Sequence, residues 1–200
     1  MSWAQPSSDD VTGKDADGGA VDLSNAMEQV QHLQGRFEQQ QFDESGELLQ
    51  ESSGRFMLLR PAYFSWDITS PDSQLIIADP EYLWHHDRDL ETVTRRPIAT
   101  AQAAAPLQVL SGDMEALSTR YQVSNIGVDR FTLIPLQADA GFEELTVQLK
   151  EGLMESMSIL DTLGQRIEVQ FLDVDSDATL TPKDFAFSPP TEADLFYYDE

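Results

Sequence analysis

Short runs of alternating apolar and polar residues dominate residues 54–96. In the run that ends at Arg60, alternation places Phe56 and Leu58 on the same face as Arg60. Pro61 ends this run because it has no backbone N–H to donate. Turn residues separate the further runs, which lie at residues 63–68, 75–78, 82–86 and 91–96. Strands this short and evenly spaced predict an antiparallel meander that curls toward a barrel.

Upstream of these strands, helical spacing predicts one amphipathic helix over about residues 23–35. The apolar positions that define it are Leu23, Met27, Val30, Leu33 and Phe37. Asp22 or Ser24 is suited to cap its start. We expect a strand at residues 35–43, a turn at residues 44–47 and a second strand that reaches Gln50.

The pattern changes after Pro97, where an Ala-rich stretch at residues 98–119 predicts one or two short helices. Pro106 is suited to start the first and Gly112 to end it. Met114 and Leu117 mark a second short helical turn. Alternation then resumes around Tyr121–Val123, Phe131–Leu133, Leu145–Leu149, Met157–Ile159 and Ile167–Phe171.

The sum is a mainly β fold with helices (α+β) of about ten or eleven antiparallel strands, an N-terminal helix and a helical insert against one face. The 200 residues suit one domain, which we place at residues 23–190. Residues 1–22 form a small-residue acidic leader that is expected to be disordered, and residues 191–200 an acidic C-terminal tail.

The formal net charge is -24, which makes nucleic acid a poor partner because its phosphates would be repelled. This charge has two interpretations: a surface kept soluble by like charge, or an adaptation to high salt. The chain has no cysteine. A disulfide scaffold, a thiol nucleophile, a cysteine-ligated metal and a lipidated N-terminal cysteine are therefore excluded.

Sequence signatures of catalysis are sparse. No phosphate-binding loop, GxSxG motif or HExxH motif is present, so an enzyme is not expected. His32 falls on the predicted helix, while His85 and His86 point to opposite faces of a predicted strand and cannot share a metal. The segment Asp173–Asp184 has the spacing of a calcium loop, but Ala178 stands where glycine is needed and Pro182 interrupts it. An acidic turn is the simpler interpretation, and we expect no metal and no cofactor.

Arg60 is the unusual residue of the central strands. Its apolar neighbours Phe56 and Leu58 predict dry surroundings, and an uncompensated buried charge costs several kcal/mol. Two arrangements remain open. The guanidinium bonds the terminal carbonyls of a short helix, for which residues 98–119 offer candidates, or it extends to the sheet rim and pairs with a surface aspartate.

The apolar side chains also exceed what a simple sheet needs. They fit either a close-packed core or an apolar cavity that flexible methionines help to line.

Several motifs together resemble one known family, the LolA outer-membrane lipoprotein carriers, over residues 23–190. The motifs are Gly54-Arg55-Phe56 with Arg60-Pro61, Phe64-Ser65-Trp66, Ser70-Pro71-Asp72, Leu75-Ile76-Ile77-Ala78-Asp79, Leu83-Trp84 with Asp87 and Leu90-Glu91, Pro106 with Leu107 and Leu110, and Phe185-Ala186-Phe187 with Pro189-Pro190. The resemblance implies a half-closed antiparallel β-barrel with a helical lid over a hydrophobic cavity.

The resemblance also implies a function and roles for single residues. The protein would be a periplasmic chaperone, its signal peptide removed, that accepts acylated lipoproteins from an inner-membrane ABC transporter and delivers them to an outer-membrane receptor. Arg60 would hold the lid shut as a lid latch, and Phe64 would dock with the transporter. The acyl-chain cavity would be lined by Phe56, Leu58, Trp66, Ile77, Trp84, Leu107, Leu110, Phe131, Leu145, Val147, Ile167 and Val169. A monomer is expected. The alternative on the same fold is a lipid-sensing or regulatory domain without transfer activity.

Overall fold

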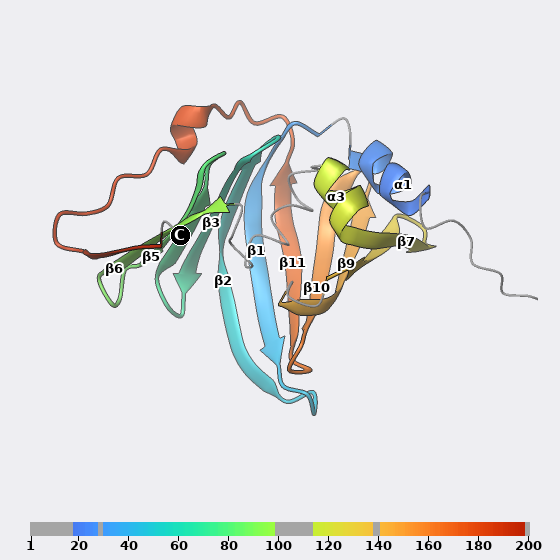
Figure 1. The fold of residues 1–200 in the computed structure, drawn as a ribbon, viewed down its shortest axis with the longest axis horizontal. Helices are drawn as coiled ribbons and strands as arrows, with labels where there is room; N and C mark the ends of the chain where they lie inside the picture. Colours follow the sequence, from blue (N-terminus) through green and yellow to red (C-terminus); the bar gives the residue numbers. More distant parts are fainter. Residues whose placement is uncertain (1–17, 28–29, 99–113, 138–140, 199–200) are drawn as a thin grey trace, which may run out of the picture.

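The computed structural model describes residues 18–27, 30–98, 114–137 and 141–198, and its centre is one twelve-stranded sheet (Figure 1). The strands are β1 (His32–Phe42), β2 (Leu48–Leu59), β3 (Tyr63–Ser70), β4 (Gln74–Ala78), β5 (Tyr82–Asp87), β6 (Thr92–Pro97), β7 (Tyr121–Gly127), β8 (Arg130–Pro135), β9 (Phe142–Lys150), β10 (Leu153–Asp161), β11 (Arg166–Asp175) and β12 (Asp194–Tyr197). The helices are α1 (Gly18–Met27), α3 (Met114–Arg120) and the 3-10 helix η3 (Pro182–Phe185).

The order of strands across the sheet is β12-β6-β5-β4-β3-β2-β1-β11-β10-β9-β8-β7. Strands β1–β11 pair antiparallel with their neighbours, as the alternation predicted, whereas β12 pairs parallel with β6. The sheet is therefore mixed. Residues 191–200, expected to be only a tail, contribute β12 to it.

The N-terminal helix is shorter than predicted, and it begins earlier, at Gly18, within the leader that was expected to be disordered. α1 ends at Met27, and Leu33 and Phe37 belong to β1, which also contains His32. The two strands expected around Gln50 and Phe56 are one long strand, β2. Of the Ala-rich stretch, residues 99–113 lie outside the described residues, and the rest contains α3 at the predicted second turn.

Strand register defines the two faces of the sheet. Phe56 of β2, Trp66 of β3 and Ile76 of β4 lie directly opposite one another, so their side chains share one face, which we call the inner face. Met57 and Ile77, each one position along, lie on the outer face. α1 and α3 lie together at the β7 end of the sheet (Figure 1).

The main hydrophobic core is built on the inner face. Leu33 and Phe37 of β1 are each 1% exposed, and Leu58 of β2 is equally buried. Leu23 of α1 and Leu117 of α3 are fully buried in the same core, which shows why these two helices stay on the sheet. Within the described residues, no helix is long and apolar enough to cross a bilayer.

A second apolar layer covers the outer face of β3–β6. The segment that follows β11, residues 176–198, is called the C-terminal segment. It runs back along these strands and ends beside β6 (Figure 1). Its Phe185 packs on Tyr63 of β3 at 5.6 Å between ring centroids, and Phe187 packs on Trp84 of β5 at 5.5 Å. The guanidinium of Arg95 lies 4.3 Å from the ring of Tyr82 and is held by cation–π attraction.

Candidate functional site

Five aromatic side chains gather on the inner face, and we call them the aromatic cluster: Phe37, Phe56, Phe64, Trp66 and Phe171. Phe37 stacks on Trp66 with ring centroids 3.7 Å apart, and Phe64 stacks on the same indole at 5.9 Å. Phe171 meets Phe56 edge to face at 5.1 Å. These rings come together because they occupy alternating positions on neighbouring strands. Together they form a broad apolar surface on the inner face.

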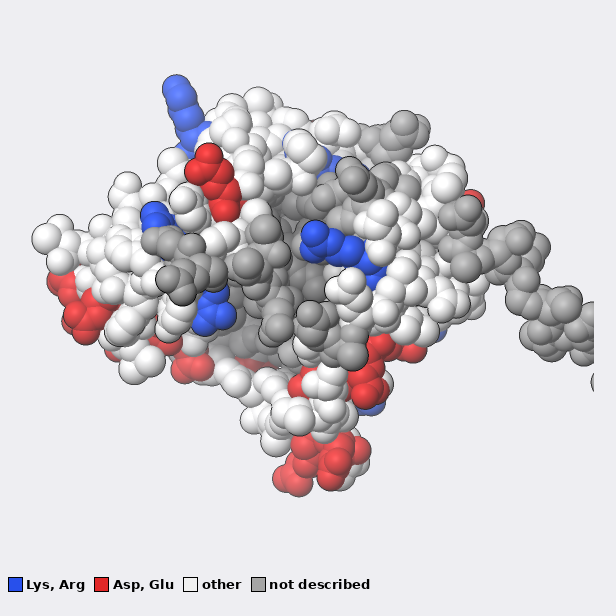
Figure 2. Space-filling model, in the orientation of Figure 1, with Lys and Arg blue, Asp and Glu red and all other residues white. Residues whose placement is uncertain are grey.

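Helices at the β7 end of the sheet add further apolar side chains to the same core. α1 contributes Leu23 and Met27, which are 0% and 2% exposed, and α3 contributes Leu117. All three belong to the core that contains the aromatic cluster. The space-filling view shows the molecule hollowed at its centre on the side seen in Figure 1 (Figure 2).

Arg60 follows β2 directly, at the border of this apolar region. Its Nη1 donates a hydrogen bond to the carbonyl of Met27, the last residue of α1, and its backbone N–H donates to the carbonyl of Gln31 at 3.0 Å. Burial lowers the pKa of Arg60 below its ordinary value, but the group stays charged at neutral pH. Terminal helix carbonyls carry partial negative charge, so this contact stabilises both groups.

Of the two arrangements left open for Arg60, the structure shows the bond to a terminal helix carbonyl. The helix that provides this carbonyl is not the one that was expected. The sequence offered residues 98–119 as the source of carbonyls, and the structure supplies the end of α1. The error follows from the predicted helix length, because a helix that continued to residue 35 would have placed Met27 in its interior.

Most of the predicted cavity residues come together on the inner face. The buried members of the core are Phe56, Leu58, Trp66, Phe131, Leu145, Val147 and Val169, and Ile167 packs against them while partly buried. Phe64, predicted to dock with a transporter, is only 4% exposed and lies inside the aromatic cluster. Leu107 and Leu110 lie outside the described residues.

Ile77 and Trp84 are corrections to the predicted cavity. They lie opposite each other on β4 and β5 and face outward, and neither belongs to the main core. Ile77 is buried, while Trp84 packs against Phe187 and Tyr197 of the C-terminal segment. These two apolar side chains therefore belong to the second apolar layer, on the outer face, and not to the core of the inner face.

The sequence prediction missed Phe37 and Phe171 as members of the site. A signal for each was present, because Phe171 alternates with Ile167 and Val169, and Phe37 alternates with Gly35 and Leu33. Phe37 was counted with the apolar positions of the predicted helix, although it falls within the strand predicted at residues 35–43, so its alternation with Leu33 was not used.

The outer face is polar over β1, β2 and β8–β11. A groove of about 690 Å³ crosses these strands and is lined by Ser, Thr, Gln and Glu side chains, including Glu38, Glu51 and Glu168. Register confirms this face, because Glu38 lies opposite Ser53 of β2 and Gln170 of β11. Over these strands the two sides of the sheet therefore have opposite character, apolar on the inner face and polar on the outer face.

The residues singled out as possible metal ligands have other partners. Asp173 forms an ion pair with Arg36, and Asp184 accepts hydrogen bonds from the backbone N–H and hydroxyl of Thr181 at 2.7 and 2.8 Å. His32 Nδ1 lies 3.1 Å from the backbone nitrogen of Leu180, which donates to it. The contacts of Asp173 with Arg36 and of Leu180 with His32 join the end of β11 and the C-terminal segment to β1.

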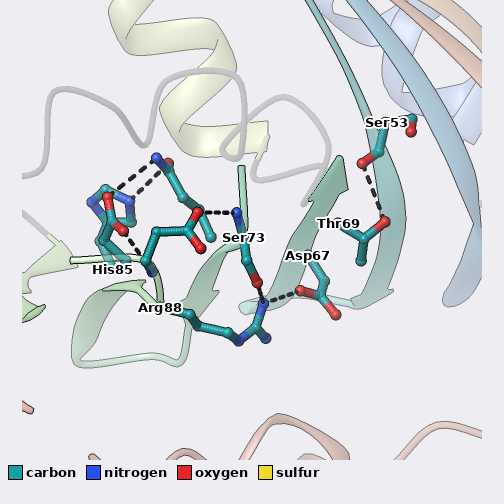
Figure 3. A network of polar contacts seen from close by, with 9 residues as sticks. Ser53, Asp67, Thr69, Ser73, His85 and Arg88 are labelled. Atoms are coloured by element: carbon teal, nitrogen blue, oxygen red, sulfur yellow. Dashed lines mark hydrogen bonds and ion pairs between the residues drawn. The ribbon is translucent and has the colours of Figure 1, made fainter. Parts of the chain in front are cut away.

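A polar network fastens β3, β4 and the β5–β6 turn (Figure 3). Arg88 Nη1 donates to Asp67 Oδ1 at 2.7 Å and to the hydroxyl of Ser73 at 3.3 Å. His85 lies on β5 with Nε2 3.2 Å from Gln74 Oε1 of β4. As predicted, His85 and His86 take opposite faces, since His85 opposes Ile76 and His86 opposes Leu75.

His85 gives the protein a predicted dependence of stability on pH. Burial lowers its pKa below the ordinary 6.5, and Arg96 acts in the same direction while Asp87 opposes the shift. As pH falls, the unfolded chain therefore takes up this proton before the folded protein does. The stability contributed by His85 is present above about pH 6.5 and is lost as pH falls toward the folded-state pKa.

We expect the urea midpoint to fall between about pH 7 and about pH 5.5, and to fall less in His85→Gln, which cannot take up a proton. His86, whose pKa is also lowered by burial, keeps part of the slope in that variant. The same pH dependence in both proteins would contradict this role for His85.

Comparison with known proteins agrees with the geometry of the site. Residues 28–188 match the family model "Outer membrane lipoprotein carrier protein LolA". The chain belongs to the LolA family. LolA proteins are periplasmic lipoprotein carriers and not enzymes, so the core described above is a carrier's core and not an active site.

Two relatives illustrate how much of a LolA protein the chain represents. It is 35% identical to the outer-membrane lipoprotein carrier protein of Alkalilimnicola ehrlichii, covering 88% of this chain and 82% of that protein. It is 34% identical to the carrier of Chromohalobacter salexigens, covering 92% and 90%. A proposed outer membrane lipoprotein-sorting protein domain from Vibrio parahaemolyticus shares the fold, with a TM-score of 0.51 at 12% identity over 86% of this chain and 97% of that one.

Proposed function

We propose that this LolA protein accepts acylated lipoproteins from an inner-membrane ABC transporter, shields their acyl chains against the inner face and delivers them to an outer-membrane receptor. The observation that carries the proposal is that two short helices complete the apolar core of the inner face. They supply Leu23, Met27 and Leu117 to the core that contains the aromatic cluster, and Arg60 bonds the end of α1. A cover made of separate short helices can be moved without breaking the sheet.

In this proposal the sheet is a half-closed barrel, and α1 and α3 are parts of its lid. Lid opening would uncover the apolar residues of the inner face, including Phe131, Leu145 and Val147, as well as the aromatic cluster. Acyl chains would then take the place of the lid side chains. The acyl-chain cavity is thus closed by the protein's own helices when no cargo is bound.

This exchange explains how a carrier can bind lipid and still release it. Each buried CH₂ contributes about 0.8 kcal/mol, so several acyl chains on an open apolar face would bind almost irreversibly. Burial of a large aliphatic side chain contributes about 1.5–3 kcal/mol. When Leu23, Met27 and Leu117 return to the core, they recover part of the free energy lost as cargo leaves.

Arg60 acts as the lid latch in this proposal. Opening α1 would break the hydrogen bond from Arg60 to Met27, and a bond with a charged donor is worth about 1.5–3 kcal/mol. Phe64 would dock with the transporter only once the lid has moved, because it is buried in the closed state.

We further propose that residues 23–190 form the carrier domain, which α1 extends back to Gly18 and to which the C-terminal segment adds β12. The protein would act as a monomer in the periplasm after loss of a signal peptide. Its strong negative charge keeps carriers apart from one another and from nucleic acid.

The three tryptophans offer a direct test of where acyl chains bind. Trp66 lies in the aromatic cluster and Trp84 lies on the outer face, while Trp3 is outside the described residues. One variant keeps only Trp66, and its matched control keeps only Trp84, the other tryptophans being replaced by phenylalanine. A triacylated lipopeptide with brominated acyl chains should quench Trp66 fluorescence and leave Trp84 fluorescence nearly unchanged.

Equal quenching of both tryptophans, or of neither, would contradict acyl binding on the inner face. Transfer is tested separately, with a purified lipoprotein loaded on the carrier and offered to the outer-membrane receptor. Quenching of Trp66 without transfer would favour the lipid-sensing alternative.

A further inference from the structure

β7 is the last strand at one end of the sheet, and among the described residues no strand pairs with its other side. An open edge presents unpaired backbone groups that another strand can join. The β7 sequence, Tyr-Gln-Val-Ser-Asn-Ile-Gly, contains no charged residue and no proline, although such residues commonly protect edges. The strand at the other end of the sheet, β12, does contain a charged residue, Asp194.

The hydrogen bonds beside β7 show which of its backbone groups face outward. Leu136 N–H donates to the carbonyl of Arg120 at 2.9 Å, which makes these two residues a hydrogen-bonded pair of the β7–β8 ladder. Such pairs alternate with non-bonded pairs along antiparallel strands. The N–H and C=O groups of Val123 and Asn125 therefore point away from β8, toward the open edge.

In this structure α1 covers the middle of that edge. A Cβ atom built on Gly19 would lie 2.2 Å from the carbonyl oxygen of Val123 and 2.7 Å from its carbon. The backbone of α1 thus rests directly on an outward-facing carbonyl of β7, which is possible only because residue 19 has no side chain. The helix that covers the inner face also covers the open edge of the sheet.

The edge borders the region proposed to take the acyl chains. The side chains of Tyr121 and Val123 are 6% and 0% exposed and belong to the same core as the aromatic cluster. Ile126 near the end of β7 and Val128 in the turn that follows are 54% and 88% exposed, and both could pack against side chains of an added strand. Displacement of α1 would therefore open the inner face and the β7 edge together.

We propose that the β7 edge is a docking strand for the extended polypeptide that follows the acylated residue of the cargo, and that α1 covers this strand when the carrier is empty. The proposal rests on the function proposed above. Because α1 rests on β7, a cargo whose acyl chains take the place of α1 would have its first polypeptide residues beside this strand. Backbone pairing needs no particular cargo sequence, and an uncharged strand does not repel an acidic one.

Two synthetic lipopeptides test the proposal on the unmodified protein. Both carry the same triacylated first residue and the same uncharged peptide of about ten residues, enough to span a strand of this length. In one of them alternate backbone nitrogens are methylated and cannot donate. We expect the methylated lipopeptide to bind about ten-fold more weakly, which corresponds to the loss of one or two backbone hydrogen bonds.

Variants of Asn125 locate the effect on β7. Asn125→Pro removes a backbone N–H that points toward the open edge, and it breaks no hydrogen bond to β8. Asn125→Ala is the matched control, because it keeps this N–H. The difference between the two lipopeptides should shrink in Asn125→Pro and persist in Asn125→Ala.

Equal affinity of the two lipopeptides for the unmodified protein would overturn the strand-docking proposal while leaving acyl binding intact. A full difference retained in Asn125→Pro would overturn the assignment to β7. If neither lipopeptide binds, the proposed carrier function fails, and strand docking of cargo fails with it.

Discussion

Arg60→Leu is expected to bind a triacylated lipopeptide roughly 10- to 100-fold more tightly than the unmodified protein and to release it correspondingly slowly. Arg60 donates a hydrogen bond to the carbonyl of Met27, and in the proposed lid mechanism cargo would break this bond as α1 moves. Its loss removes about 1.5–3 kcal/mol from the closed state only. Leucine keeps the border of the site apolar, so binding itself is not impaired.

The measurement is a pair of rates, for lipopeptide uptake and for its transfer to acceptor vesicles. Arg55→Leu is the control, because Arg55 lies on the same strand, is exposed and faces the other side of the sheet. It removes the same charge without touching α1. Unchanged affinity and unchanged transfer in Arg60→Leu would show that the contact with Met27 does not oppose cargo binding.

The sheet itself could be predicted from the sequence because alternation and turn residues act locally. Strands β4–β6 and β8–β11 lie close to their predicted positions. The residue at which α1 ends could not be predicted in the same way. Leu33 and Phe37 are four residues apart, and this spacing suits one face of a helix as well as one face of a strand.

The faces of β4 and β5 were predicted less well because both sides of these strands are apolar. Ile76 belongs to the inner face and Ile77 to the outer face, and periodicity cannot tell which side holds the cavity. The cover of the outer face comes from Phe185 and Phe187, which lie about a hundred residues away in a segment with little regular structure. Such a layer is visible only in three dimensions.

The candidate site could be predicted in outline because Arg60 ends an apolar strand and requires a partner in a dry place. Its actual partner could not, since that depended on where α1 ends. The structure also shows what is distinctive about pairing the Arg60 cation with a helix carbonyl. A terminal carbonyl bonds a guanidinium without a second ionised group, so the contact can open with no carboxylate left buried and unpaired.

Gly54→Ala is expected to destabilise the fold by about 3 kcal/mol or more, because the aromatic cluster needs the space that this glycine leaves. Gly54 lies opposite Phe37 of β1 and Ile68 of β3. A Cβ atom at this position would lie 1.9 Å from the carbonyl oxygen of Asp67 and 2.8 Å from the ring of Phe37. The first of these atoms is backbone, so β2 and β3 would have to separate.

The expected loss is measured as a fall in the free energy of unfolding by urea, at neutral pH and with no lipid present. Gly127→Ala is the matched control, because a Cβ there would meet its nearest neighbour at 3.6 Å. Near-equal stability of the two variants would show that β2 and β3 can move apart at Gly54 at little cost in free energy. The prediction also bears on function, because Phe37 stacks on Trp66 across this glycine. If Gly54→Ala displaces that ring, the surface proposed to receive acyl chains loses its shape even in molecules that remain folded.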